Sequence, residues 1–164
     1  VISTLNDLLL SGDKIIKIEA VLSGTLSYIF NNFGGSKTFS ETVIEAKNKG
    51  YTEPDPRDDL NGIDVSRKLL ILGRECGIKL EMKDIEVENL VPENLRKTSS
   101  IDQFLKKLQT ADSYFDKIRI RAQKENKKLR YIGIVENGKA KVYTLAEMEA
   151  CAIKEYKAKK KSSK

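Results

Sequence analysis

The chain has 164 residues, of which 40% are hydrophobic and 33% are charged, and its formal net charge is +6. This composition is typical of one globular domain with a buried core and a charged surface. The sequence contains no histidine, which excludes Ser–His and Cys–His triads and His-ligated zinc within these residues. Any proton transfer by this chain must therefore use lysine, tyrosine or a carboxylate.

Composition also constrains the setting in which the protein works. No apolar run approaches the length needed to cross a membrane, and no signal peptide is visible at the start. Cys76 and Cys151 lie far apart in sequence and form no metal motif, so both are expected to be packing residues in a reducing compartment. We therefore expect a cytoplasmic protein with no bound metal and no membrane partner.

The positive charge is concentrated at one end of the chain. Residues 154–164 contain six lysines and one glutamate, so they carry most of the net charge of +6. A basic nucleic-acid binder is one interpretation of this excess, but a lysine-rich tail is more often a solvated segment. We therefore expect no nucleic-acid partner.

The first 35 residues predict a helix, a strand and a second helix. Residues 1–12 have the apolar spacing of a short helix that ends at Gly12, and the β-branched residues 15–22 favour a strand. Ser23-Gly24-Thr25 then opens a helix that stops at Gly34-Gly35. Such a turn presents backbone N–H groups to an anionic or carbonyl group, although an ordinary strand-to-helix turn with Ser23 as cap is the more common meaning.

The most unusual segment of the chain follows a helix that Thr38-x-x-Glu41, a capping box, starts and Gly50 ends. Within residues 50–68, two prolines hold the backbone extended, Asp55 is a good N-cap, and Pro56 takes the first helical position. The pattern predicts one continuous helix from there to Gly77.

Asp64 and Lys68 lie four residues apart on this predicted helix, so both side chains leave the same face. Their sequence neighbours are apolar, which is compatible with a buried structural ion pair or with a functional site. On spacing alone the structural pair is the more common case. Glu53, on the stiff segment before the cap, can point back toward the same region, and this favours a site where acidic groups converge on a lysine.

The string Gly-Tyr-Thr-Glu-Pro-Asp-Pro-Arg-Asp-Asp-Leu-Asn-Gly-Ile-Asp-Val-Ser-Arg-Lys, residues 50–68, closely resembles the substrate-site signature of homoserine dehydrogenases. These enzymes interconvert aspartate 4-semialdehyde and homoserine with a nicotinamide cofactor. The resemblance implies that Lys68 is the general acid/base and that Glu53 and Asp64 hold the substrate's amino end and order the lysine. It further implies that Tyr51 and Asp59 line the substrate pocket.

A second stretch, Ser-Gly-Thr-Leu-Ser-Tyr-Ile-Phe-Asn from residue 23, is similar to another signature of the same family. There the turn faces the substrate and the nicotinamide end of the cofactor, which implies that Gly24 contacts the cofactor and Thr25 contacts both. NAD and NADP are both compatible with the resemblance. The chain lacks the strand, GxGxxG turn and helix that usually bind a dinucleotide, and in the family that domain lies N-terminal to these residues.

The remaining elements are predicted from periodicity and turn signals. We expect a strand at 85–90, a helix after Ser99-Ser100, a helix over 112–128, and strands at 129–135 and 139–143. Asn137-Gly138 between the last two strands is a strong hairpin signal. Thr144-x-x-Glu147 is a capping box that predicts a final helix leading into the lysine-rich tail.

The hairpin and the residues before it are also similar, more loosely, to the bifunctional aspartokinase–homoserine dehydrogenases. The resemblance covers residues 1–142, which it identifies as the catalytic, substrate-binding and dimerisation domain without its dinucleotide-binding domain. Residues 143–164 do not match the family. We predict an α+β fold in which helices cover one face of a mixed sheet. The other face or an edge is then available to a second copy, so we expect a homodimer or higher homo-oligomer.

The implied function is that of an oxidoreductase domain that reduces L-aspartate 4-semialdehyde to L-homoserine with NADPH or NADH. Without a dinucleotide-binding domain we expect this chain to be inactive on its own. The alternative is a non-catalytic module that oligomerises and binds substrate. Turnover of the semialdehyde by the chain distinguishes the two interpretations.

Overall fold

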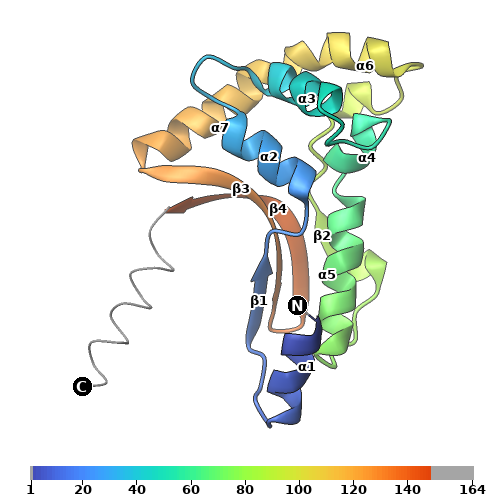
Figure 1. Ribbon diagram of the computed structural model, residues 1–164, viewed down its shortest axis with the longest axis vertical. Helices are drawn as coiled ribbons and strands as arrows, with labels where there is room; N and C mark the ends of the chain where they lie inside the picture. The colour runs from blue at the N-terminus through green and yellow to red at the C-terminus, as the bar shows by residue number, and fades with distance from the viewer. Residues whose placement is uncertain (1, 149–164) are drawn as a thin grey trace.

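A computed structural model describes residues 2–148 of the chain (Figure 1). Its helices and strands follow in the order α1 (Ile2–Leu10), β1 (Lys17–Ala20), α2 (Gly24–Asn32), α3 (Phe39–Asn48), α4 (Pro56–Leu60), α5 (Ile63–Glu75), β2 (Ile85–Val87), α6 (Ile101–Leu108), α7 (Asp112–Lys124), β3 (Lys127–Glu136) and β4 (Lys139–Met148). Short 3₁₀ turns precede β2, α6 and α7, at Met82–Asp84, Glu93–Leu95 and Gln109–Ala111.

The four strands form one mixed sheet in the order β1–β3–β4–β2. Strand β3 pairs antiparallel with β1 and β4, whereas β2 runs parallel to β4. The turn between β3 and β4 contains Asn137 and Gly138, whose φ angles of 51° and 73° are both positive, as a type I′ hairpin turn requires. The predicted α+β class and the predicted hairpin are confirmed.

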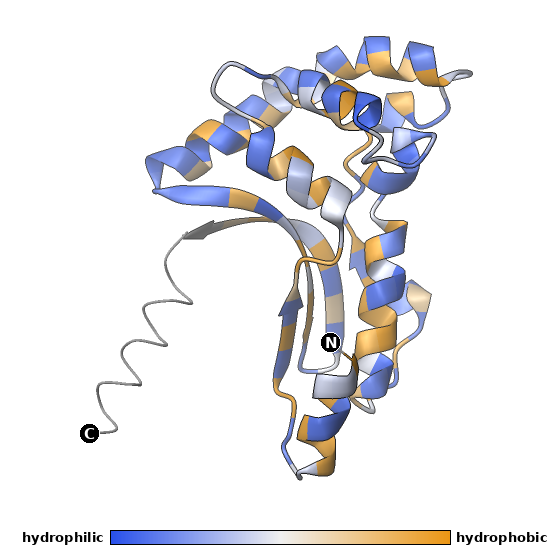
Figure 2. Ribbon diagram, viewed as in Figure 1, coloured by the Kyte–Doolittle hydropathy of each residue, from blue (hydrophilic) through white to orange (hydrophobic). Residues whose placement is uncertain are grey.

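The helices cover one face of this curved sheet. Helix α5 runs along the lower part of the sheet in Figure 1, while α2 and α7 lie across the upper part beneath α3 and α6. Figure 2 shows apolar and polar segments alternating along these helices, as in amphipathic helices that cover a sheet. The approach is close: a Cβ on Gly133 in β3 would lie 3.0 Å from the Leu69 side chain of α5.

The core lies between the sheet and these helices, and its centre is aromatic. Phe39 of α3 stacks on Phe115 of α7 with ring centroids 3.6 Å apart, and Phe33 packs edge-on against both rings. Phe39 and Phe115 are 0% and 2% exposed. Asp112 adds a polar link, because its carboxylate accepts hydrogen bonds from the backbone N–H and the hydroxyl of Ser40, both at 2.7 Å. Helices α3 and α7 are therefore joined by buried phenylalanine rings and by the Asp112 carboxylate of α7, which accepts an N–H from the first turn of α3.

Four helices begin where local capping signals predict. The side chains of Ser23, Thr38, Asp55 and Ser100 each accept a backbone N–H in the first turn of the helix that follows. Glu41 completes the capping box by accepting the N–H of Thr38 at 2.8 Å. These starts are decided by neighbours in sequence, which is why they can be predicted without the fold.

The prediction of one continuous helix from Pro56 to Gly77 is wrong. The helix breaks at Gly62, whose φ of +74° is left-handed, and α5 restarts at Ile63, whose N–H is accepted by the Asn61 side chain at 2.8 Å. Tertiary packing explains the break, because a Cβ on Gly62 would lie 2.1 Å from the hydroxyl of Tyr131 in β3. The chain bends where Tyr131 of the sheet leaves no room for a side chain.

The predicted final helix starting at Thr144 is also wrong within the described residues. Strand β4 continues to Met148 and pairs with β3 along its whole length, as far as Lys127. A capping box is a local signal, whereas this pairing satisfies backbone groups across the ladder. Helix α7 accordingly ends at Lys124 rather than at 128, and β2 ends at Val87. The rest of the predicted helix and the lysine-rich tail lie outside the described residues.

Candidate substrate site

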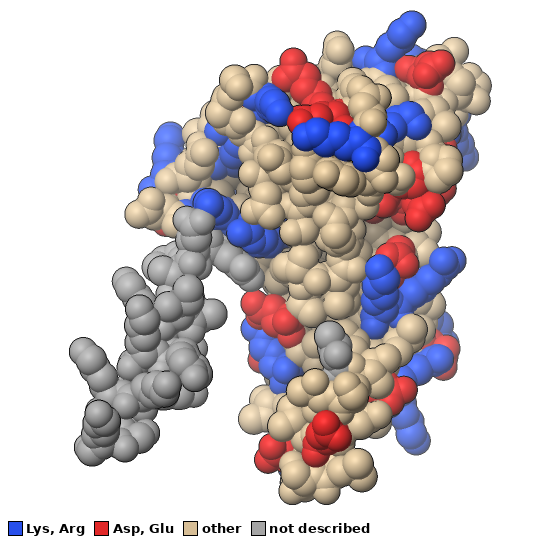
Figure 3. Space-filling model, viewed as in Figure 1, with Lys and Arg blue, Asp and Glu red and all other residues tan. Residues whose placement is uncertain are grey.

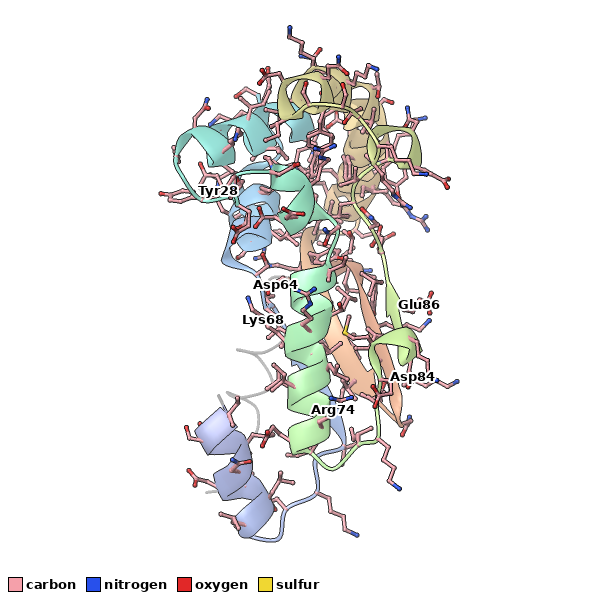
Figure 4. All side chains as sticks on the ribbon, turned by 90° about the vertical axis from the view of Figure 1, so that its right-hand side faces the viewer. Tyr28, Asp64, Lys68, Arg74, Asp84 and Glu86 are labelled. Atoms are coloured by element: carbon pink, nitrogen blue, oxygen red, sulfur yellow. The ribbon has the colours of Figure 1, made fainter. Side chains whose placement is uncertain are left out.

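Helix α5 presents Asp64 and Lys68 on its outer surface (Figure 4). The Asp64 Oδ2 and Lys68 Nζ atoms are 2.6 Å apart, and their side chains are 59% and 49% exposed. The possibility of a buried structural pair is therefore wrong. An exposed pair of this kind contributes at most about 1 kcal/mol to stability. The lysine can consequently exchange one partner for another at little cost to the fold.

Lys68 also reaches the connection between β1 and α2. Its Nζ donates a hydrogen bond to the backbone oxygen of Leu22 at 3.1 Å. An ammonium group has three donors, and the contacts with Asp64 and Leu22 use two of them. The lysine is thus held against the Ser23-Gly24-Thr25 turn, which is 45 residues away in sequence.

The turn itself is open on one side. Gly24 is exposed, and a Cβ built on it would meet nothing within 4 Å. Thr25 is instead turned toward the loop after α3, where its hydroxyl donates to the backbone oxygen of Tyr51 at 2.6 Å. The turn therefore has an unobstructed surface beside Lys68 and a fixed contact with the loop that carries Tyr51 and Glu53.

Side chains hold the loop from Gly50 to Asp55 through its backbone. The Glu53 N–H donates to Asp59 Oδ2 at 2.8 Å, and Lys47 Nζ donates to the Pro54 oxygen at 2.8 Å. Asp55 pairs with Arg57, whose guanidinium also donates to the backbone oxygen of Thr98 at 2.8 Å. Arg57, through its side-chain hydrogen bonds, holds the pKa of the Asp55 carboxyl below its usual range. The Glu53 residue is exposed.

The structure thus gathers the sequence-predicted residues into two groups. Lys68, Asp64 and the Leu22 oxygen form one group, whereas Thr25–Tyr51 and Glu53–Asp59 contacts form the other. The short connection from Leu22 to Thr25 joins them. Figure 3 shows acidic and basic side chains next to one another along the edge formed by α4 and α5. The arrangement is an exposed polar surface able to hold a small zwitterionic molecule by its charges.

Sequence reasoning missed one residue of this region, Tyr28. Its ring packs edge-on against the Tyr51 ring, with centroids 4.9 Å apart and an interplanar angle of 67°. The signal that could have found it is its spacing, since it follows Thr25 by three residues and lies on the same face of α2. Within residues 2–148 there is no cluster of three or more potential metal ligands and no helix long and apolar enough to cross a membrane.

Comparisons with known proteins agree on one family. The family model described as homoserine dehydrogenase matches residues 1–160, so the match extends beyond residue 142, where the motif resemblance ends. The bifunctional aspartokinase/homoserine dehydrogenase 2 of Arabidopsis thaliana is 53% identical over 136 residues, which are 83% of this chain and 15% of that protein. The homoserine dehydrogenase of Schizosaccharomyces pombe is 46% identical over 91% of this chain and 41% of that protein.

Solved structures share the fold. A crystal structure of a Candida auris protein of unknown function superimposes with a TM-score of 0.86 at 43% identity, covering 90% of this chain and 43% of that one. The homoserine dehydrogenase of Thiobacillus denitrificans gives a TM-score of 0.66 at 20% identity, covering 93% of this chain and 32% of that one. The chain therefore spans less than half the length of each relative described here.

Proposed function

The chain belongs to the homoserine dehydrogenase family, and on that premise we propose that it provides the substrate-binding half of an enzyme that reduces L-aspartate 4-semialdehyde to L-homoserine. One observation carries the proposal. Lys68 Nζ, the best-placed proton carrier in a chain without histidine, is exposed and lies between the Asp64 carboxylate and the Leu22 oxygen, beside an open turn.

The substrate is an amino acid, so its ammonium group needs acidic partners. We assign this role to Glu53 and Asp64, and we assign Tyr51, Asp59 and Thr25 to the wall of the site. Charge-assisted hydrogen bonds to an ammonium are roughly twice as strong as neutral ones, so they orient the molecule as well as bind it. The ordered loop supports this assignment, because Asp59 holds the Glu53 backbone at 2.8 Å.

Lys68 is assigned the proton transfer at the reacting oxygen. When the aldehyde carbon is reduced, negative charge develops on its oxygen, and a lysine ammonium can stabilise that charge and donate a proton. In the reverse direction a neutral lysine must accept the hydroxyl proton of homoserine, so oxidation is favoured by rising pH. The Asp64 carboxylate keeps the Lys68 amine oriented in both the reduction and the oxidation.

A nicotinamide cofactor, NAD or NADP, supplies the hydride when bound. The open surface beside Gly24 fits the nicotinamide end, with Gly24 and Thr25 as the contact residues. The rest of a dinucleotide needs a glycine-rich turn between a strand and a helix of a parallel βαβ unit. Within residues 2–148 the only parallel pair is β2 with β4, and no GxGxxG sequence precedes a helix there. We therefore assign most of the cofactor contacts to residues other than these.

The face of the sheet opposite α2, α5 and α7 supports a second proposal, that the protein forms a homodimer or higher homo-oligomer. Strand alternation puts four apolar side chains on this face, from Ile132, Ile134, Tyr143 and Leu145. Ile132 is only 1% exposed, but it lies outside the main core cluster. Sedimentation of the chain and of Ile134→Lys would test this, since a charge at the centre of a contact should give a smaller species.

We also propose a cytoplasmic location. The sequence has only two cysteines, which lie far apart and form no disulfide framework, and burial raises the pKa of the Cys76 thiol, which lowers its reactivity. Fractionation of cells that express the tagged full-length protein would test the proposal, and recovery in an organelle fraction would contradict it.

The function is tested by titrating the chain with L-homoserine and measuring binding by calorimetry. We expect Glu53→Leu to weaken binding by about tenfold or more, the loss of one charged hydrogen bond. The matched control is Glu75→Leu, an exposed acidic residue at the far end of α5, which should bind as the wild type does. Equal binding by all three chains, or by none, would refute the proposed site.

Turnover separates the enzyme from a non-catalytic module. The chain and its full-length parent are each mixed with aspartate 4-semialdehyde and reduced cofactor, and the absorbance of the cofactor is followed. In the parent, Lys68→Met should lose most of kcat while the fold is retained, because the Lys68 pair is exposed. A parent protein that binds homoserine but never oxidises the cofactor would favour the module.

A further inference from the structure

Two side chains of α2 hold the same residue, Tyr51, of the loop from Gly50 to Asp55. Thr25 donates its hydroxyl to the Tyr51 backbone oxygen at 2.6 Å, and Tyr28, one turn later, packs its ring edge-on against the Tyr51 ring at 4.9 Å. The Tyr51 residue is 52% exposed, so the core does not fix its side chain. The Tyr51 N–H also donates to the Ala46 oxygen of α3 at 3.0 Å, so the two contacts with α2 decide the position of the Tyr51 ring and carbonyl rather than of its nitrogen.

The Tyr28 hydroxyl is itself held by α3. It donates to Glu45 Oε1 at 3.1 Å and accepts from Lys49 Nζ at 2.8 Å. Glu45 also forms ion pairs with Lys37 at 2.5 Å and with Lys49 at 2.7 Å. Lys37, Lys49 and the tyrosine hydroxyl lower the pKa of Glu45 to about 2, so its carboxylate is charged at neutral pH. The Tyr28 side chain is therefore held at two places: its hydroxyl is bonded to Glu45 and Lys49, and its ring packs against the Tyr51 ring.

The loop leaves α3 directly after this cluster. Only Lys49 and Gly50, with a φ of +72°, separate the end of α3 from Tyr51, and Lys47 of the last turn donates to Pro54. The N–H groups of Gly50 and Tyr51 donate to the Lys47 and Ala46 oxygens at 2.9 and 3.0 Å, which fixes the turn as far as the Tyr51 nitrogen. Beyond that nitrogen, the contacts of the Tyr51 oxygen and ring, together with the Lys47 bond to Pro54, decide the direction in which the loop continues toward Glu53.

We propose that Tyr28 is a positioning residue for the substrate site, which holds Tyr51 and thereby aims the loop that carries Glu53. Tyr28 does not belong to the set of substrate contacts assigned above, and it acts through Tyr51. The inference rests on the proposed function, because the loop matters for binding only if Glu53 meets the substrate's ammonium. Its first consequence, a fixed loop, can be measured without any ligand.

The first experiment measures amide hydrogen exchange of residues 50–55 in the ligand-free chain. Tyr28→Leu removes the ring contact, so we expect the Glu53 amide, which is bonded to Asp59, to exchange up to about tenfold faster, the size of one aromatic pair. Tyr28→Phe keeps the ring and should stay within about threefold of the wild type. The matched control is Tyr114→Leu, because Tyr114 is 55% exposed and packs edge-on against Phe115 on α7.

The second experiment titrates the same four chains with L-homoserine. Tyr28→Leu should weaken binding by about tenfold, equivalent to roughly 1.4 kcal/mol, whereas Tyr28→Phe and Tyr114→Leu should bind within about threefold of the wild type. In the full-length parent, Tyr28→Leu should raise KM for the amino acid and leave KM for the cofactor unchanged. A residue that only stabilised the fold would not separate the two KM values.

The outcomes distinguish the inference from its premise. If Tyr28→Leu changes neither exchange nor binding, or weakens binding with unchanged exchange, Tyr28 is not a positioning residue. If exchange accelerates in residues 50–55 but the wild-type chain binds no L-homoserine, the positioning is supported and the proposed substrate fails. If Tyr28→Leu raises exchange throughout the sheet, Tyr51→Leu replaces it in the ligand-free exchange experiment, because it removes the same ring contact from the exposed partner, and it should raise exchange within residues 50–55 alone. Unchanged exchange in that variant would overturn the inference.

Discussion

The segment Gly50–Lys68 and the aromatic core under α7 are stabilised in different ways. The segment is exposed at Tyr51, Glu53, Asp64 and Lys68, and it is ordered by single hydrogen bonds between side chains and backbone. The core consists of rings that exclude water, with Phe39 and Phe115 stacked at 3.6 Å. A group that must meet a ligand cannot be covered by the protein's own side chains, so it has to be positioned by polar contacts.

The energies of the two regions differ accordingly. An exposed ion pair contributes about 0–1 kcal/mol, whereas truncating a buried phenylalanine costs about 3–5 kcal/mol. Substitutions in the core should therefore change the free energy of unfolding without changing the affinity of the folded chain. Substitutions of the exposed residues of Gly50–Lys68, namely Tyr51, Glu53, Asp64 and Lys68, should do the reverse. Gly62, between α4 and α5, is an exception. It lies within the segment but packs against Tyr131 of the sheet, so its substitution should lower the free energy of unfolding as a core substitution does.

Phe39→Ala should give the largest loss of stability, about 3–5 kcal/mol, because it leaves a cavity against Phe115 and Phe33. Urea unfolding followed by circular dichroism would measure it, with Phe39→Leu as the smaller truncation. The remaining folded fraction should bind L-homoserine as the wild type does. A loss below about 1 kcal/mol would mean that the ring stack is not the centre of the core.

Gly62→Ala should cost about 2–4 kcal/mol, since it adds a collision with the Tyr131 hydroxyl to the strain of a positive φ. Gly77→Ala is the matched control, because Gly77 has a φ of +75° and nothing within 4 Å of the added Cβ. It should lose only about 1 kcal/mol. Equal losses in the two variants would show that packing against Tyr131 does not cause the break between α4 and α5.

Asp112→Ala should cost about 1.5–3 kcal/mol, because two donors of Ser40 lose a charged acceptor and Ser40 is 1% exposed. Asp116→Ala on the same helix removes a pair with Arg119 in which the carboxylate side chain is 42% exposed, and it should cost less, about 1 kcal/mol. Thermal or urea unfolding of both variants would compare them. A larger loss for Asp116→Ala would contradict the idea that Asp112 joins α7 to α3.

Glu45→Gln should have the smallest effect, and that effect should depend on pH. The lysines lower the pKa of Glu45 from 4.5 to about 2, so the stability it contributes is fully present above pH 4.5 and is lost as the pH falls through 2. The difference in Tm between the wild type and Glu45→Gln should therefore shrink over this range, and added salt should reduce it at neutral pH. A difference that grows on acidification would contradict the assignment.

Much of the fold was predictable because its signals are local. Capping side chains at Ser23, Thr38, Asp55 and Ser100 start their helices, and Asn137-Gly138 forms the hairpin turn. The two errors have a common cause. The break at Gly62 and the continuation of β4 beyond Thr144 both depend on β3, which lies more than 60 residues from Gly62 in sequence and satisfies backbone groups that no local pattern describes.

The site shows the same division. The sequence by itself determined the family, the residue types available for proton transfer, and the pairing of Asp64 with Lys68, because four-residue spacing puts both on one helical face. Only the tertiary structure decided that this pair is exposed, that Lys68 meets the Leu22 oxygen, and that Tyr28 and Thr25 hold Tyr51. The physical reason is that exposure and contacts between distant segments depend on how the helices pack on the sheet.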